Sequence, residues 1–201
     1  LLSLPFLSNA QNEVANTKAY LIQNASKEHL SSLDIDEMII SSEYLSPTTG
    51  WYHIYFNQTF RSIEVYNGML NATLQQGEVK YIGNNFVPNI ASFISKNAIS
   101  SSPLSGIQAI QRAALSKDLG TGKIEQKSVA NSSNGEILNA TFVDETLSDE
   151  IIRVKKYWLP YESTENGKTI TKVALTWNVH FLTKDKKNHW NIHVEVASGA
   201  I

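Results

Sequence analysis

Two runs of alternating apolar and polar residues near the end of the chain constrain its fold most strongly. Their apolar positions are Val173, Leu175, Trp177, Val179 and Phe181 in the first run, and Trp190, Ile192, Val194 and Val196 in the second. Alternation is the period of a strand with one buried face, so the two runs predict a half-buried antiparallel hairpin. The apolar residues have odd numbers in the first run and even numbers in the second. If both sets lie on one face of the sheet, the two residue numbers of each directly opposed pair therefore add up to an odd number. We therefore expect His180 opposite Asn191 or His193, on the polar face.

The rest of the chain alternates between helical and extended patterns. A first helix is expected from Asn16 or Thr17 to about Leu33, and a second has Ser102 as N-cap, Pro103 at its first position and Gly120 just past its end at Leu119. Strands are expected at residues 51–59, 63–66, 69–74, 78–81 and 151–161, with a weaker one at 137–143. The order predicts an α+β fold of two modules, each a helix packed on an antiparallel sheet, joined near residues 91–101.

The first ten residues resemble the end of a secretory signal. An apolar stretch containing Pro5 is followed by small residues and Ala10, which predicts a signal-peptide remnant at 1–10 with cleavage before Gln11. A buried N-terminal strand is the alternative, although Pro5 disfavours it. The signal predicts a secreted, extracellular protein. Asn-x-Ser/Thr triplets are then glycosylation acceptors, or chance products of a composition rich in Asn and Ser; they begin at Asn24, Asn57, Asn71, Asn131 and Asn139.

Composition excludes several classes of function. The 201 residues contain no cysteine, which rules out thiolate catalysis, zinc-thiolate sites and disulfides. With 17 Lys and Arg against 19 Asp and Glu, the chain lacks the excess of positive charge that binds nucleic acid or anionic membranes. No apolar run approaches the roughly 18 residues of a membrane span. We therefore expect neither nucleic acid nor, after signal removal, a membrane as a partner.

Catalytic motifs are missing from the sequence. It contains no HExxH zinc-peptidase helix, no GxSxG nucleophile elbow and no phosphate-binding or calcium-binding loop. The chain itself is therefore not expected to be an enzyme. The nearest approach to a metal-ligand set is His180, His193 and Glu195 on the polar face of the last hairpin, with His189 nearby. Solvated strand residues are the alternative interpretation, and we predict no metal site in this chain.

Two acidic clusters are interpreted as solvated. Asp34, Asp36 and Glu37 supply too few oxygen ligands in sequence for calcium. The second cluster, which we interpret as a charged loop, consists of Asp144, Glu145, Asp149 and Glu150.

An aromatic run provides candidates for a partner interface. On a strand, Trp51, His53 and Tyr55 share one face, and Tyr52, Ile54 and Phe56 share the other. Aromatic residues on both faces indicate that one face packs in the core and that the second contacts a partner domain. The interface candidates are Trp51, His53 and Tyr55; burial of the whole run in the core is the alternative.

The same region resembles the fungalysin/thermolysin propeptide motif. The similarity is carried in order by residues 50–60, 63–68, 70–71, 77–79 and 83–87, with Ser62 where the motif usually has glycine or another small residue. The second half resembles the PepSY-type segment of fungalysin-family zymogens in residues 102–105, 157–160, 175–179 and 190–201. There, Glu195 and Ala200 stand where the family usually has Asp and Glu.

The resemblance implies a domain organisation and a fold. Residues 11–43 are an N-terminal helix and turn, 44–91 the propeptide-motif module and 100–201 the PepSY-like module. Both modules are expected to be cystatin-like, in tandem. The chain is then the prodomain of a secreted zinc metallopeptidase, which it inhibits and helps to fold by steric occlusion of the cleft. Its partner is the cognate catalytic domain, and zinc belongs to that domain, so that no cofactor is expected in this chain.

Two alternatives from other classes remain open. One is a free-standing secreted module that binds peptides or cell-wall components on a sheet surface. The other is an autonomous hydrolase that uses the histidine cluster of the last hairpin.

Overall fold

A computed structural model describes residues 6–94 and 103–201. Contacts divide the chain into two units, Leu1–Ser92 and Phe93–Ile201, and each is described by itself. The predicted signal remnant lies partly outside the described residues. Its remaining residues belong to the first helix, which begins at Phe6 and continues through the predicted cleavage position.

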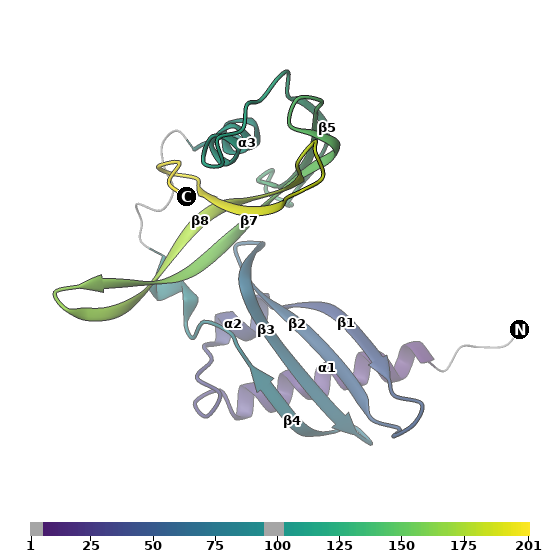
Figure 1. Cartoon of the computed structure of the whole chain (residues 1–201). Coiled ribbons are helices and arrows are strands. Elements are labelled where there is room, and N and C mark those ends of the chain that lie inside the picture. Colours follow the sequence, from purple (N-terminus) through teal and green to yellow (C-terminus); the bar gives the residue numbers. More distant parts are fainter. Residues whose placement is uncertain (1–5, 95–102) are drawn as a thin grey trace, which may run out of the picture. The chain divides into compact units, whose positions relative to one another are not determined.

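From Phe6 onward, the first unit contains two α-helices, a short 3-10 helix and four antiparallel strands (Figure 1). The strands pair in the spatial order β1-β2-β3-β4. The elements are α1 (Phe6–Gln23), α2 (Ser32–Glu37), β1 (Ile39–Leu45), β2 (Tyr52–Phe60), β3 (Ile63–Gln75), β4 (Glu78–Asn84) and η1 (Ile90–Ser92).

The core of the first unit lies on one face of this sheet. Ile54 and Phe56 of β2 are fully buried there, and Leu21 of α1 and Ile35 of α2 belong to the same cluster. Tyr52 packs against the cluster as a partly buried side chain. The alternation of β2 therefore places Tyr52, Ile54 and Phe56 on the core face, and leaves His53 and Tyr55 on the other face.

The first helix begins earlier and ends earlier than predicted. It starts at Phe6 rather than near Thr17, and its regular part ends at Gln23 rather than near Leu33. After a further turn, His29 adopts a left-handed φ of 56° and the Leu30 amide donates to the Ala25 carbonyl, which closes the helical segment. A new helix, α2, then begins with Ser31 as its N-cap. The apolar pattern extended across this break because both helices contribute to one core.

The described residues of the second unit form one α-helix and five antiparallel strands, paired in the order β5-β6-β7-β8-β9. The long β7–β8 hairpin extends well past the end of β9, as Figure 1 shows in green. The elements are α3 (Gly106–Leu115), β5 (Glu125–Asn131), β6 (Ile137–Asp144), β7 (Ser148–Glu165), β8 (Lys168–Leu182) and β9 (His189–Glu195).

Helix α3 is shorter than predicted. Its N-cap is Ser105, whose hydroxyl accepts from the backbone N–H of Gln108. The side-chain oxygen of Gln108 accepts in turn from the backbone N–H of Ser105. The predicted cap, Ser102, lies outside the described residues. The helix ends at Leu115, and Asp118, not Gly120, takes the left-handed conformation that closes it. Ala109, Ile110, Ala113 and Ala114 are buried on this helix.

The register predicted for the last hairpin is confirmed. His180 lies opposite Asn191, and Val179 pairs with Ile192. Val179, Phe181, Ile192 and Val194 are buried, as the alternation requires. The indole N–H of Trp177 donates to the Leu104 carbonyl at 2.8 Å, which ties the segment before α3 to β8.

The predicted α+β fold of two tandem cystatin-like modules, each a helix packed on an antiparallel sheet, is wrong. In the part of the chain that the structure describes, about half of the residues lie in strands and far fewer lie in helices. Polar segments account for much of the difference: six of the seven residues of β5 and all seven of β1 are exposed. Backbone pairing on one side is enough to hold such strands, so they need no apolar pattern. Among the described residues, no helix has the length and apolar character needed to span a membrane.

Candidate functional site

A ring stack covers part of the solvent-facing side of the first sheet. The pairing of β1 with β2 places Tyr44 opposite His53, and their rings stack with centroids 4.9 Å apart. Tyr44 also stacks on Tyr55 at 6.4 Å. A hydrogen bond with Tyr55 raises the pKa of Tyr44, so the phenol remains neutral in ordinary buffers. Tyr44 is 49% exposed, so this stack is a surface feature.

The same side of the sheet extends across β3 and β4. His53 Nδ1 lies 3.2 Å from the Thr73 hydroxyl, and Thr73 pairs in turn with Tyr81, which is 59% exposed. Met69 pairs with Asn57, two residues beyond Tyr55, and is 48% exposed on the same side. We call this surface the aromatic face; it consists of Tyr44, His53, Tyr55, Met69 and Tyr81.

Two of the three interface candidates lie on the aromatic face. His53 and Tyr55 point to it, whereas Trp51 precedes β2 in the turn, where its carbonyl accepts from the Ser46 amide at 2.8 Å. Sequence reasoning missed Tyr44, because the residues before it looked like a turn and a short apolar run. The outward positions of β1 carry no alternation that would have identified it.

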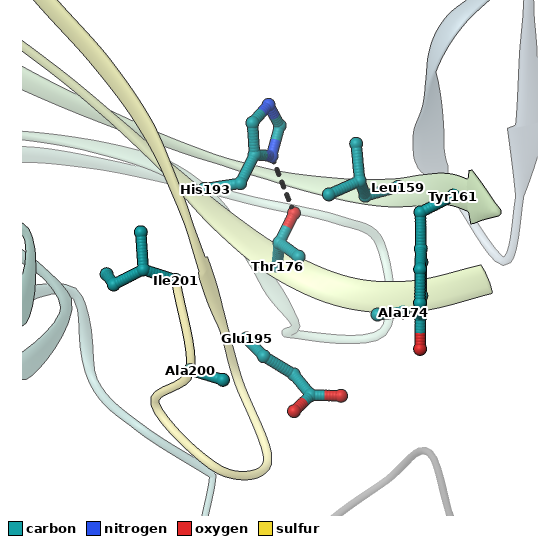
Figure 2. Close-up of a pocket in the computed structure, with 8 residues that line it drawn as sticks. All are labelled: Leu159, Tyr161, Ala174, Thr176, His193, Glu195, Ala200 and Ile201. Atoms are coloured by element: carbon teal, nitrogen blue, oxygen red, sulfur yellow. Dashed lines mark hydrogen bonds between the residues drawn. The ribbon is translucent and has the colours of Figure 1, made fainter. Parts of the chain in front are cut away.

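A pocket of about 330 Å³ lies in the second unit (Figure 2). Three neighbouring strands and the end of the chain form its walls, which are mostly apolar. The lining residues are Leu159 and Tyr161 of β7, Ala174 and Thr176 of β8, His193 and Glu195 of β9, and Ala200 and Ile201.

Strand register and a tight turn bring the pocket residues together. Leu159 pairs with Ala174, and Thr176 pairs with Glu195, so their side chains share the face opposite the core. After β9 the chain reverses: the Glu195 amide donates to the Ala200 carbonyl, and the Gly199 amide donates to the Glu195 carbonyl, both at 2.8 Å. Gly199 has a φ of 75°, which favours glycine. This reversal places Ile201 beside the pocket (Figure 2).

His193 is held as a neutral imidazole. The Thr176 hydroxyl lies 2.9 Å from Nδ1 and also contacts the Tyr157 carbonyl at 3.3 Å, which can only accept. Thr176 therefore donates to Tyr157 and accepts from Nδ1–H. The Asn178 amide nitrogen lies 2.9 Å from Nε2, which must then be the acceptor. Burial lowers the pKa of His193, in agreement with this neutral form.

The metal candidates are not brought together. On the outer face of the hairpin, Glu195 lies opposite Thr176 and His193 lies opposite Asn178. His180 is the next outward residue of β8 after Asn178, so the three candidates occupy three successive outward positions. The first and last of these positions are four residues apart, or about 13 Å along a strand. His180 instead contacts His189, with ring centroids 4.3 Å apart. Burial, followed by the charges of His189 and Arg153, lowers its pKa.

Within residues 6–94 and 103–201, no three His, Asp or Glu side chains are grouped closely enough to hold a metal ion. The pocket itself offers apolar walls, one carboxylate and a neutral imidazole whose two nitrogens already have partners.

Compared with models of protein families and with curated proteins, the chain matches none. The resemblance to a fungalysin-type propeptide accordingly stays a prediction.

Proposed function

We propose that this chain is a prodomain that inhibits a secreted zinc metallopeptidase and assists its folding by covering the active-site cleft. The observation that carries the proposal is the aromatic face. Tyr and Met are enriched in protein interfaces, and a Tyr ring supplies a large contact area at low entropic cost. Tyr44, Tyr81 and Met69 are each about half exposed on one side of one sheet. A surface of this kind is suited to a protein partner.

Steric occlusion is the mode of inhibition that the residues favour. The chain has no cysteine, so a thiolate cannot ligate the zinc of a partner. His193 uses both ring nitrogens within its own unit. An interface of the usual size, about 1,600 Å², can cover a cleft without any metal ligand. The same interface assists folding, because a partner that binds only the folded enzyme stabilises that state by mass action.

The test is inhibition in trans. The full 201-residue chain is titrated against a purified fungalysin-type zinc peptidase, with residual proteolysis and the mass of the complex recorded. We expect saturable one-to-one inhibition. Absence of a complex at micromolar concentrations would overturn the proposal and favour a free-standing binding module.

Matched variants locate the interface. We expect Tyr44→Ala to weaken inhibition by about tenfold or more, as for an aromatic residue at the centre of an interface. Tyr44→Phe keeps the ring and should retain most of the inhibition. Leu115→Ala, which removes a 66% exposed apolar side chain from α3, is the control. Equal losses in Tyr44→Ala and Leu115→Ala would show that the aromatic face is not the contact surface.

A further inference from the structure

One edge of β8 is only partly paired. β7 pairs with β8 from Lys168 to His180, but the pairing with β9 ends where Thr176 meets Glu195. Among the residues that the structure describes, no other strand pairs with β8 before this point. Residues 168–174 therefore form a free strand edge, and this edge leads directly to the pocket lined by Ala174 and Thr176.

The backbone groups along this edge are directed away from β7. The Leu175 carbonyl accepts from the Val196 amide on the β9 side. Because backbone direction alternates along a strand, Val173, Thr171 and Thr169 present their N–H and C=O groups to the same side. Pro160, which has no N–H, lies opposite Val173, as expected for a pair that shares no hydrogen bond.

The pocket beside the edge has a distinct chemical character. Leu159, Ala174 and Ile201 give it apolar walls, and Glu195 supplies its one carboxylate. The Ser198 hydroxyl donates to this carboxylate, and no described Lys or Arg lies within ion-pair distance of it. The nearby Lys172 is paired with Glu165 at 2.5 Å, and this contact raises the pKa of Lys172. Glu195 is thus a negative charge available to a ligand.

We propose that the second unit binds an extended peptide by strand addition to residues 168–174 of β8. One apolar side chain of the peptide enters the pocket, and a basic side chain two residues away pairs with Glu195. Backbone hydrogen bonds to Thr169, Thr171 and Val173 supply affinity, and the pocket supplies selectivity. The spacing follows from the strand period, because residues i and i+2 lie on one face. This site shares no residue with the aromatic face and does not depend on the proposed prodomain function.

The first test uses blocked pentapeptides and the full chain. The probe is acetyl-Thr-Phe-Thr-Lys-Thr-amide, and the comparison peptides carry Gln or Glu in place of Lys. Binding is followed by amide shifts in ¹H–¹⁵N spectra. We expect a dissociation constant between about 10 µM and 1 mM, with shifts at Thr169, Thr171, Val173 and the pocket. The Gln peptide should bind about two- to fivefold more weakly, as for an exposed ion pair, and the Glu peptide more weakly still.

Three variants and one control, Thr171→Ala, separate the parts of the site. Thr171→Pro removes a backbone N–H from the free edge and leaves the hydrogen bonds between β8 and β7 in place. It should weaken binding of the probe peptide, whereas Thr171→Ala should not. Ala174→Leu fills the pocket and should abolish the preference for Phe over Ala in the peptide. Glu195→Gln should make the Lys and Gln peptides bind with equal affinity.

Several results would overturn the proposal. They are no binding at about 1 mM probe, shifts confined to other surfaces, or undiminished binding of a probe whose backbone nitrogens are methylated and so cannot donate to the edge. Tyr44→Ala should leave peptide binding unchanged. Failure of the peptide site is thereby distinguished from failure of the prodomain proposal, whose readout is inhibition of a peptidase.

Discussion

Each unit buries one aspartate, and the two are used differently. Asp34 and Asp144 are both only 1% exposed. Asp34 accepts from the amide and hydroxyl of Ser31, from the Gln58 side chain and from the Asn89 amide. Asp144 accepts from the backbone amides of Gly122, Thr146 and Leu147. The first carboxylate joins α2, β2 and the segment after β4, whereas the second mainly shapes the turn between β6 and β7. The first unit therefore depends on its carboxylate for long-range closure.

The largest expected effect follows from removing Asp34. Asp34→Ala leaves the Asn89 N–H and one of the two Gln58 amide N–H groups without an acceptor in a buried site, while the other still reaches the Val87 carbonyl. We expect a loss of about 3–5 kcal/mol in unfolding free energy. Urea denaturation measures the loss, and hydrogen exchange should place it around α2, Gln58 and Asn89. Asp36→Ala, one exposed carboxylate on the same helix, is the control and should cost less than about 0.5 kcal/mol. Similar costs for both variants would contradict the closure role.

A smaller effect is expected at Asp144. Asp144→Ala should cost about 2–3 kcal/mol, because the donors it abandons are backbone amides near a turn that water can partly reach. Glu145→Ala, an exposed neighbour, is its control. Asp144→Asn should recover much of the loss, since an amide oxygen still accepts from backbone N–H groups, and denaturation of the three variants checks this order. A larger loss at Asp144 than at Asp34 would reverse the comparison.

The sequence did not reveal either buried aspartate. Both acidic clusters were interpreted as solvated, because composition does not distinguish a surface carboxylate from one that collects hydrogen bonds. A local signal existed for one of them: Ser31 and Asp34 have the spacing of a capping box, and the structure shows both of its bonds. The partners Gln58 and Asn89 are distant in sequence, so no local pattern could identify them.

Strong alternation was predictive, and polar strands were not. The alternation of β8 and β9 limited the partner of His180 to Asn191 or His193, because a one-residue slip would have placed the two apolar sets on opposite faces, and the structure shows Asn191. In contrast, β1 and β5 are edge strands with almost no buried residues, and their absence from the prediction contributed to the wrong fold class. For the candidate sites, His53 and Tyr55 were identifiable from strand period. The pocket was not, because it depends on how the chain reverses after Glu195.

The capping boxes sharpen the comparison at a smaller scale. Both α2 and α3 begin with one, at Ser31 and Ser105. Ser31→Ala should cost about 1–2 kcal/mol, since the hydroxyl also donates to the buried Asp34, and Ser105→Ala about 0.5–1 kcal/mol at an exposed cap. Threonine at each position should restore most of the stability. Thermal unfolding of the four variants tests the order, and equal costs would show that the Ser31 bond to Asp34 adds nothing beyond capping.

The smallest expected effect is the pH dependence that His193 gives the second unit. Burial lowers the pKa of His193, and its Nε2 accepts a hydrogen bond from Asn178, so protonation of this imidazole is unfavourable in the folded chain. The unfolded chain takes it up near pH 6.5, the ordinary value for histidine. Between about pH 7.5 and 5.5 the unfolded state therefore binds more protons, and the unfolding free energy falls as pH falls. The lowered pKa of His180 acts in the same direction.

A variant separates His193 from the other titrating groups. His193→Gln should unfold with a shallower dependence on pH over this range than the parent chain, whatever its stability at neutral pH. The carboxyl groups with lowered pKa values, such as Asp185, titrate at more acidic pH and do not change protonation in this range. Hydrogen exchange at the two pH values should place the acid-induced loss in β8 and β9. An unchanged slope in His193→Gln would mean that the hydrogen bonds to Thr176 and Asn178 rearrange around a protonated ring at no cost.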